Sequence, residues 1–414
     1  MSLETHIAGS EDRLLDSLTF AGKNTASYVT ERRSCTFAPQ SGGNFSPAGI
    51  RLMRFNLADQ QGWLDAGTLR LAFTLMNKST TADMKPVVEN PAGMFRRLRV
   101  IANGSCEIEN IEQYGRVNQM FNYLLPSARR FCNISETWGG ITQNATLDTP
   151  YDITPLAKGT SRRVMSPKLS SFLSQGRWIP LSMVPVVLEL ELDDYDASFV
   201  GTGNLWECIR PTLLADVCAM DMALQNSFAK HLLDGKSLPY NFHGLYSLKA
   251  TVTSPGQYSL PINRGFTRLS TVYFSFTKQG EKENTFFYHP LEGQVPTDAI
   301  DVFKYNMTLG SDRYPAFDVD CVQEQYYRLR LASLMHTGTD SFSMSTLQYR
   351  IGHGIFAMNL EKAPGESGHT GVNTRSGSQL TINLKNCGAA LMLHVVLHFD
   401  CVLNCSAAGC ELLD

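Results

Sequence analysis

Two histidines, His394 and His398, lie four residues apart in a segment whose pattern predicts a strand. Side chains of a strand alternate between its two faces, so both imidazoles share one face and could bind a metal ion together. Two imidazoles alone do not complete a site, because zinc centres use three or four protein ligands. We therefore expect a packed or interfacial histidine pair and predict no metal ligand.

Acidic and serine motifs are the next candidates for chemistry. Asp193, Asp194 and Asp196 stand together, as do Asp318 and Asp320. Neither group has the full pattern of a calcium loop, so we expect solvated turn carboxylates. Residues 365–368 come close to a serine-nucleophile motif but lack its second glycine at the right place, and no phosphate-binding glycine loop occurs.

The ten cysteines include no Cys-x-x-Cys pair. Cys401, Cys405 and Cys410 are close in sequence, but their spacing is not that of a zinc finger. The N-terminus lacks a basic start followed by an apolar run, so we expect no signal peptide and a cytosolic site of synthesis. Free thiols that pack as small apolar side chains are the expected state.

Arginines cluster in four short groups. These are Arg32 and Arg33; Arg96, Arg97 and Arg99; Arg129 and Arg130; and Arg162 and Arg163. A nucleic-acid contact is one interpretation, but acidic residues balance these short groups. We expect salt bridges between subunits, because arginine suits bidentate pairing at interfaces. The pattern shows no catalytic constellation, so we predict no enzymatic activity, no catalytic residue and no cofactor.

Composition sets the class of fold that must carry these residues. The chain has 414 residues, of which 43% are apolar and 18% charged, with a net charge of -3. It is able to bury cores, which excludes a disordered protein, and it lacks the basic excess of a dedicated nucleic-acid binder. Abundant glycine and aromatic residues, with modest glutamate and lysine, favour a β-rich protein.

Alternating and apolar segments predict strands along most of the chain. In the first half the chain turns β-like from Ser34, and we expect strands near residues 50–57, 69–75, 95–101, 106–109, 178–181, 186–192 and 212–222. In the second half we expect them near 244–253, 257–262, 267–277, 348–360, 379–385 and 391–403. Asn103-Gly104 predicts a tight hairpin turn.

Helices are fewer and shorter. An apolar stripe from Ile111 to Leu124 predicts one helix, ended by Pro126, and another is expected at 322–335. A short amphipathic helix at 228–233 marks the candidate junction of two domains. Residues 133–176 are rich in serine, threonine, glycine and asparagine, and we interpret them as a surface excursion.

An internal repeat sets the domain count. Glu112-Gln113-Tyr114 matches Glu324-Gln325-Tyr326, and Ser46-Pro47 matches Ser254-Pro255, in both cases about half the chain apart. In each half the Glu-Gln-Tyr segment begins a helix after a strand pair. We therefore predict an N-terminal arm at 1–24, a first β-sandwich at 25–225, a linker helix and loop at 226–240 and a second sandwich at 241–414.

Several segments resemble the double jelly-roll major capsid proteins of large and mid-sized eukaryotic double-stranded DNA viruses. Residues 32–38 are similar to the family's Arg-Arg-x-x-x-Phe-Ala signature, and 213–221 with Phe228-Ala229 to the strand and helix that close the first jelly roll. Residues 296–301 and 402–409 resemble, more loosely, a segment of the second jelly roll and the C-terminal ending. The full Asn-Phe-Ser-Arg motif of the second domain is absent, which favours a small or divergent relative.

The resemblance implies an all-β fold of two tandem eight-stranded jelly rolls with short helices in connecting loops. It implies a structural protein whose homotrimers are pseudo-hexagonal capsomers and self-assemble into an icosahedral shell. Loops near 133–176, 278–297 and 361–377 would form outer towers. The implied partners are copies of itself, minor capsid proteins and potentially an internal membrane, with synthesis in the host cytoplasm and no sequence-specific nucleic-acid binding.

Two other interpretations stay open at this point. One is a minor capsid or vertex jelly-roll protein, although such proteins often have a single jelly roll. The other is a carbohydrate-binding or carbohydrate-processing tandem β-sandwich, which would need an aromatic platform. The four tryptophans Trp63, Trp138, Trp178 and Trp206 are dispersed in sequence and do not decide the question.

Overall fold

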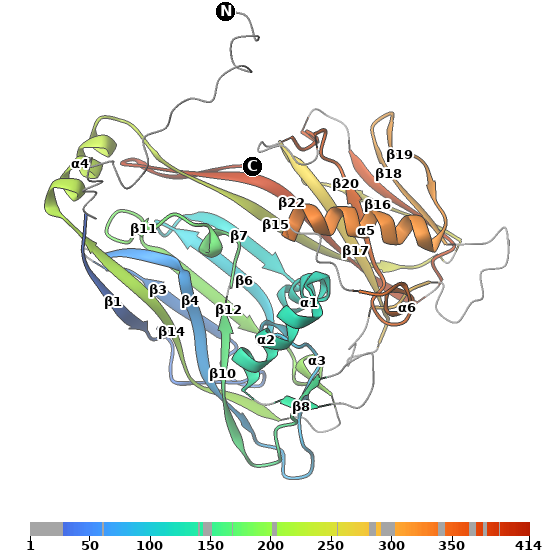
Figure 1. Ribbon diagram of the computed structural model, residues 1–414, viewed down its shortest axis with the longest axis horizontal. Helices are drawn as coiled ribbons and strands as arrows, with labels where there is room; N and C mark the ends of the chain where they lie inside the picture. Colours follow the sequence, from blue (N-terminus) through green and yellow to red (C-terminus); the bar gives the residue numbers. More distant parts are fainter. Residues whose placement is uncertain are drawn as a thin grey trace, which may run out of the picture.

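The structure of the chain is a computed structural model, shown in Figure 1. It describes residues 28–59, 62–139, 141–143, 151–167, 169–200, 205–254, 256–280, 287–290, 303–337, 344–363, 370–375, 379–388 and 390–414. The predicted arm at 1–24 and the motif at 296–301 lie outside these residues. So do the segment at 365–368 and parts of the loops at 278–297 and 361–377.

The first half of the chain contains two main antiparallel sheets. One has the order β1-β14-β4-β10, with the short strands β2 and β11 attached, and the other has the order β3-β12-β6-β7. The bounds are β1 Val29–Phe37, β2 Asn44–Phe45, β3 Leu52–Leu57, β4 Gly62–Asn77, β6 Phe95–Ala102, β7 Cys106–Glu112, β10 Ser161–Pro167, β11 Ile179–Pro180, β12 Val186–Leu192 and β14 Trp206–Met220. Two small ribbons pair β5 (Lys85–Pro86) with β13 (Phe199–Val200), and β8 (Ile141–Gln143) with β9 (Tyr151–Ile153).

The second half repeats this arrangement. Its sheets have the orders β15-β22-β17-β20, with β23 attached to β22, and β16-β21-β18-β19. The bounds are β15 Leu238–Val252, β16 Gln257–Ile262, β17 Leu269–Lys278, β18 Lys304–Leu309, β19 Asp312–Val319, β20 Ile355–Asn359, β21 Leu380–Lys385, β22 Leu391–Ser406 and β23 Gly409–Leu413.

Both halves thread their eight principal strands through the sheets in the same way. Counted along the chain, strands one, eight, three and six form one sheet, and strands two, seven, four and five form the other. This order in two facing sheets is a jelly roll. The predicted all-β fold of two tandem eight-stranded jelly rolls is confirmed, and the duplication inferred from the short sequence repeat is visible in the strand order.

Local sequence explains why these strands form. In β3 the burial alternates strictly, with Met53, Phe55 and Leu57 buried and the residues between them exposed, so one face packs on the core. The turn between β6 and β7 has positive φ at Asn103 (50°) and Gly104 (71°). A type I′ hairpin turn requires positive φ at both central residues, which asparagine and glycine tolerate best.

The helices lie in equivalent connections of the two jelly rolls. Between β7 and β10 the chain forms α1 (Tyr114–Leu124) and α2 (Ser127–Trp138), and between β19 and β20 it forms α5 (Val322–Thr337) and α6 (Thr346–Arg350). The repeated Glu-Gln-Tyr segment therefore begins a helix after a hairpin in both halves, as predicted. The helix α4 (Met222–Leu233) stands between β14 and β15, and a short α3 (Tyr195–Ser198) precedes β13.

Two local predictions are wrong, and some strands were not predicted. Residues 133–176 are not a surface excursion, because Ile134 and Trp138 of α2 are buried and β10 is a strand of the main sheet. The predicted strand at 348–360 begins as α6, since Ser345 and Gln348 form a capping box that starts a helix there. The strands β18, β19 and β23 were not predicted.

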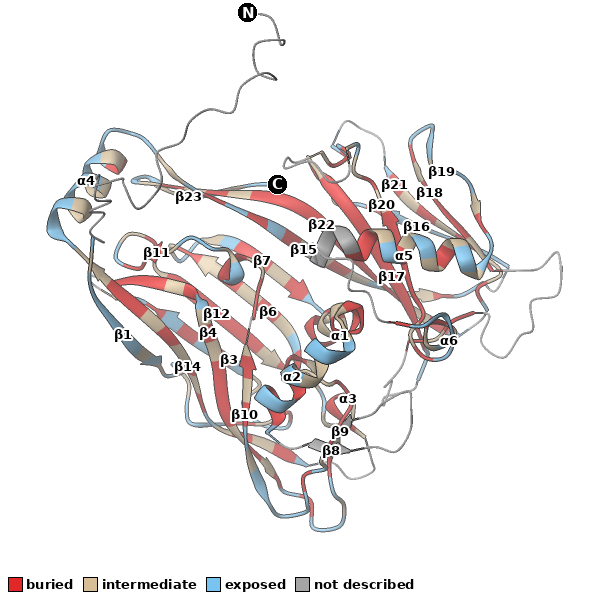
Figure 2. Cartoon of the chain, viewed as in Figure 1, coloured by how far each residue is buried: buried red, intermediate tan, exposed pale blue. Residues whose placement is uncertain are grey.

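The two halves meet along a packed seam. Phe172, in the 3-10 turn Phe172–Ser174 of the first half, has its ring centroid 5.4 Å from that of Phe242 in β15. Phe121 of α1 lies 5.4 Å from Tyr273 of β17 by the same measure. α5 also packs on this sheet, since its Ala332 carbonyl accepts a hydrogen bond from the Tyr273 hydroxyl, and β22 and β17 are buried along nearly their whole lengths, on both faces (Figure 2).

Candidate functional site

The histidine pair of β22 is packed, as predicted. His394 Nε2 lies 2.9 Å from Thr277 Oγ1, and His398 Nδ1 lies 3.1 Å from Ser270 Oγ. Burial lowers the pKa of His394 to about 3, so its imidazole is neutral at ordinary pH. Among the residues that the structure describes, no three histidine, cysteine, aspartate or glutamate side chains gather in a way that could hold a metal ion.

Asp400 is a buried neighbour of this pair that sequence reasoning missed. Its Oδ1 lies 2.8 Å from Nδ1 of His243 in β15, and the His243 ring stands 4.8 Å from the ring of His398. The hydrogen bond with Asp400 raises the pKa of His243. The available signal was the position of Asp400, two residues after His398 and therefore on the same face of the strand.

The acidic turns are used within the chain. Asp194 forms an ion pair with Arg51 at 2.9 Å, and Asp193 accepts a hydrogen bond from the Asp194 amide. Asp318 accepts hydrogen bonds from Asn306 and Arg313 and pairs with Lys385 at 3.2 Å. These carboxylates are therefore not simply solvated, because they tie loops and strand ends to neighbouring strands.

The arginine clusters pair mostly within the chain, which corrects the expectation of bridges between subunits. Arg97 pairs with Glu191 at 3.2 Å, and Arg99 pairs with both Glu107 (2.7 Å) and Glu189 (2.9 Å). Arg130 Nε donates to Glu89 at 2.9 Å, and Arg162 donates to the carbonyl of Thr154 at 2.6 Å. The physical reason is register, since β12 sets Glu189 and Glu191 directly opposite Arg99 and Arg97 of β6.

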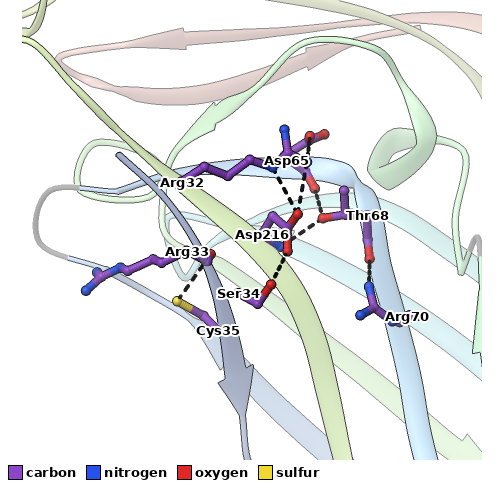
Figure 3. A network of polar contacts seen from close by, with 8 residues as sticks. All are labelled: Arg32, Arg33, Ser34, Cys35, Asp65, Thr68, Arg70 and Asp216. Atoms are coloured by element: carbon purple, nitrogen blue, oxygen red, sulfur yellow. Dashed lines mark hydrogen bonds and ion pairs between the residues drawn. The ribbon is translucent and has the colours of Figure 1, made fainter. Parts of the chain in front are cut away.

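The clearest polar network fixes the edge strand β1 (Figure 3). Arg32 donates through Nε to Asp216 of β14 at 3.0 Å and through Nη2 to Asp65 of β4 at 2.8 Å. Ser34 Oγ donates to the other oxygen of Asp216 at 2.7 Å. Hydrogen bonds from Ser34 and then Arg32 lower the pKa of Asp216, so its carboxylate stays charged and three strands are joined.

Two of the motifs that carried the family resemblance meet here. Residues 32–37 of the first motif pair antiparallel with residues 218–213 of the second, as neighbouring strands β1 and β14. The helix that follows the second motif is also anchored, because Phe228 of α4 lies 4.9 Å from Trp63 between ring centroids. The C-terminal motif at 402–409 contains the turn between β22 and β23.

The same strand presents a candidate contact surface. β1 lies at the edge of its sheet, and its residues 30–34 are all exposed, on both faces. At its start Tyr28 is 62% exposed and its carbonyl accepts the Asp221 amide, beside Met222 at the start of α4, which is 66% exposed. Leu233, at the end of α4, is 81% exposed. Exposed apolar side chains beside an open strand edge are typical of a surface that another molecule covers.

Two surface cavities of about 560 and 500 Å³ share Arg264 in their walls. The Arg264 guanidinium stacks on the rings of Tyr246, Phe266 and Phe399 at 4.9–5.1 Å and pairs with Asp414 at 2.8 Å. Its charge and its plane are thus already used in packing. No helix in the described ranges is long and apolar enough to cross a membrane.

The tryptophans do not form an aromatic platform. Trp138 and Trp206 are buried, with the Trp138 indole donating to the Glu89 carbonyl at 2.8 Å, and Trp63 is covered by α4. Trp178 is half-buried, and its carbonyl accepts from the hydroxyl of Tyr240 across the seam at 3.3 Å. Carbohydrate-binding sandwiches stack sugars on exposed rings, and these four indoles do not provide such a surface.

Comparison with known proteins gives a match in structure. No protein-family profile and no curated protein sequence matches the chain. VP54 of PBCV-1, in a crystal structure fitted into a reconstruction of the virophage Sputnik, is similar with a TM-score of 0.65 at 13% identity. The match covers 95% of this chain and 99% of that one. This chain has a double jelly-roll fold.

Two further solved structures support this double jelly-roll assignment. The Faustovirus major capsid protein matches with a TM-score of 0.62 at 6% identity, covering 94% of this chain and 92% of that one. A chain of the Sputnik virophage matches with a TM-score of 0.59 at 11% identity, covering 98% and 93%. The likeness therefore spans both jelly rolls, and the resemblance drawn from short motifs is confirmed for the fold.

Proposed function

We propose that the protein is a major capsid protein that forms homotrimeric, pseudo-hexagonal capsomers and builds an icosahedral virion shell. The observation that carries the proposal is the structural match over nearly the full length of both chains, to the VP54 structure and to a major capsid protein. The double jelly-roll architecture favours this role over a minor or vertex protein with a single jelly roll. Three of the four tryptophans are buried and Trp178 is half-buried, which removes the support for a carbohydrate-binding sandwich.

The seam inside the chain suggests how chains would join. Within one chain, β15 of the second jelly roll packs beside β7 of the first, and Ser247 of β15 donates to the carbonyl of Glu112. β1 holds the place in the first jelly roll that β15 holds in the second, and β19 holds the place in the second that β7 holds in the first. β1 and β19 lie at opposite ends of the molecule (Figure 1). In a ring of three chains with six similar jelly rolls, β1 of one chain would meet β19 of the next.

The exposed residues of these strands fit that arrangement. β1 is open on both faces, and in β19 Phe317 is 53% exposed, with Tyr327 of the adjacent α5 50% exposed. An interface that joins different surfaces of identical chains closes into a ring when its rotation divides the circle, and the proposed ring would close with three copies. Arg33, near the exposed middle of β1, pairs with Asp59 and keeps the strand ordered for such contact.

The remaining parts of the proposal follow from the role. A capsid protein of this kind has no enzymatic activity and no cofactor, and its final location is the virion, after synthesis in the host cytoplasm. Its partners are neighbouring capsomers, minor capsid proteins and an internal membrane beneath the shell. The near-neutral chain, with a net charge of -3, can pack densely against its own copies and leaves the neutralisation of the genome to other components. We keep 25–225, 226–240 and 241–414 as the proposed domain limits.

The experiment is to purify the full chain and to measure its mass in solution by light scattering after size exclusion. We expect a stable species of about three times 45.9 kDa, the mass of one chain. A chain that remains monomeric across a wide concentration range would overturn the proposed capsomer. Binding of glycans by such a monomer would instead support the carbohydrate-binding alternative.

A further inference from the structure

Two thiols face each other at the C-terminal hairpin. β22 and β23 are joined by the two residues Ala407 and Ala408, and in the register of the hairpin Cys405 lies directly opposite Cys410. Their Sγ atoms are 3.1 Å apart. Directly opposed residues of an antiparallel pair have Cα atoms about 4.5–5.5 Å apart, which lies within the range of about 4.4–6.8 Å that disulfides span. The backbone therefore needs no rearrangement for the two sulfur atoms to bond.

The two thiols differ in access and in reactivity. Cys405 is 2% exposed, whereas Cys410 is half-buried and open to a small reagent. The hydrogen bond with Cys405 lowers the pKa of the Cys410 thiol. The thiolate is the nucleophile in thiol–disulfide exchange, so Cys410 is suited to attack first and Cys405 to resolve.

The first jelly roll contributes to the same place. Asn103, in the turn between β6 and β7, donates from its side-chain amide to Cys410 Sγ at 3.6 Å. A donor at this sulfur stabilises a thiolate and orients it along the hairpin. The half-buried Cys106, at the start of β7, lies near the same thiols. Burial is the main cause that raises the pKa of Cys106, and electrostatic repulsion from Cys410 raises it further.

We propose that Cys405 and Cys410 are an oxidation site that takes a small disulfide such as glutathione disulfide and forms an intrachain disulfide. The Cys410 thiolate attacks one sulfur of glutathione disulfide, which releases one glutathione thiolate and leaves a mixed disulfide on Cys410. The Cys405 thiol then loses its proton and displaces the second glutathione. The chain loses two protons and two electrons in total, and these reduce one glutathione disulfide to two glutathione molecules.

Cys106 is the competing partner that the structure disfavours. It comes from a strand of the other jelly roll, whereas Cys405 and Cys410 are held opposite each other by the backbone pairing of one hairpin. The bond would tie β23 to the last residues of β22, beyond the stretch that β17 pairs, whether or not the chain assembles with others. A chain made in a reducing cytosol would carry the thiols, and an oxidising medium would convert them.

The test uses the full-length protein equilibrated in glutathione buffers of increasing oxidised fraction, quenched with an alkylating reagent and digested with trypsin. Residues 386–414 form one tryptic peptide with four cysteines, and Cys106 lies in a separate peptide at 100–116. Compared with the reduced protein, we expect the 386–414 peptide to carry two fewer alkyl groups. The mass of the peptide itself, without its alkyl groups, should be lower by two hydrogens. Further digestion at Ala407-Ala408 should give two fragments that remain joined until reduction.

Variants keep the assignment specific. Cys410→Ser and Cys405→Ser should each abolish this loss of two thiols, and Cys132→Ser, which removes an exposed thiol far from the hairpin in sequence, should leave it intact. The wild-type peptide map decides the matter even if a variant folds poorly. Retention of all four alkylatable thiols in the fully oxidised buffer, or a link between the 100–116 and 386–414 peptides, would overturn the proposal.

Discussion

The first strands of the two jelly rolls hold equivalent places in the fold but are secured in different ways. β15 packs apolar side chains across the seam, where Tyr240 and Phe242 meet Phe172. β1 is exposed on both faces and is held by the network of Arg32, Asp65 and Asp216. The strand whose neighbour lies in the same chain thus uses hydrophobic burial. The strand that would meet another chain relies on polar contacts that tolerate water until assembly.

The largest effect is expected where the seam is most apolar. Phe172→Ala removes a fully buried ring between the jelly rolls and should lower the free energy of unfolding by about 3–5 kcal/mol, as such truncations do. Chemical denaturation followed by fluorescence measures this. A loss below about 1 kcal/mol would show that the seam does not stabilise the chain.

Glu109 of β7 makes the same seam sensitive to pH. Burial raises its pKa from 4.5 to about 7, although its Oε2 accepts a hydrogen bond from the Phe172 amide at 3.3 Å. A raised carboxyl pKa means that the folded state holds the proton more tightly than the unfolded state. The contribution to stability is complete below pH 4.5 and is lost as the pH rises through 7.

Glu109→Gln should remove this loss. The shift corresponds to about 3 kcal/mol at most, so the variant should gain up to that amount over the wild type at pH 8 and little at pH 4.5. Denaturation at several pH values measures the difference, and His243, whose pKa is raised by its hydrogen bond with Asp400, is common to both proteins. A difference that does not vary with pH would contradict the assignment.

Phe317 tests the outer counterpart of the seam. Because this ring is 53% exposed in the single chain, Phe317→Ala should leave the free energy of unfolding of the monomer within about 0.5 kcal/mol. If β19 meets β1 of the next chain, the same change should weaken the trimer by about 1 kcal/mol or more. Light scattering against concentration separates the two effects. Leu347→Ala is the control, because Leu347 is also exposed but lies in α6, away from β19 in the sequence.

The smallest effect is expected in the network of β1. Asp216→Asn removes the charge that Arg32 and Ser34 hold, but these ion pairs are open to solvent and contribute little to global stability. We expect faster amide hydrogen exchange in Val29–Phe37 with an almost unchanged unfolding transition. Asp312→Asn, at the exposed start of β19, should change neither, and equal exchange in both variants would count against the network.

Sequence periodicity predicted the regular strands well. β12 and β16 occur at the predicted residues, because the sequence of β12 alternates leucine with glutamate and β16 alternates in burial. β19 was missed since its burial barely alternates, and α2 was missed because a bias towards serine and asparagine masks the few buried side chains that fix it. Apolar or alternating local sequences therefore predicted strands even where, as in β17, both faces are buried, whereas the irregular pattern of β19 gave no such signal.

The candidate site could be predicted only in part. The motifs at 32–38 and 213–221 were both identified, yet Arg32 and Asp216 are separated by 184 residues, and no local pattern indicates that their strands pair. The same applies to His243 and Asp400, which lie opposite each other on neighbouring strands but come from the first and eighth strands of the second jelly roll along the chain. The duplication was the long-range signal in the sequence. It predicted the fold, but not which distant residues contact each other.

The central claim is that the seam within one chain is repeated between chains around a ring. A three-dimensional reconstruction of the assembled protein by electron microscopy tests it most directly. The account predicts a trimer with a pseudo-hexagonal outline in which β1 of each chain packs against β19 of its neighbour. A closed assembly in which β1 and β19 both face solvent, or a two-fold dimer, would contradict it.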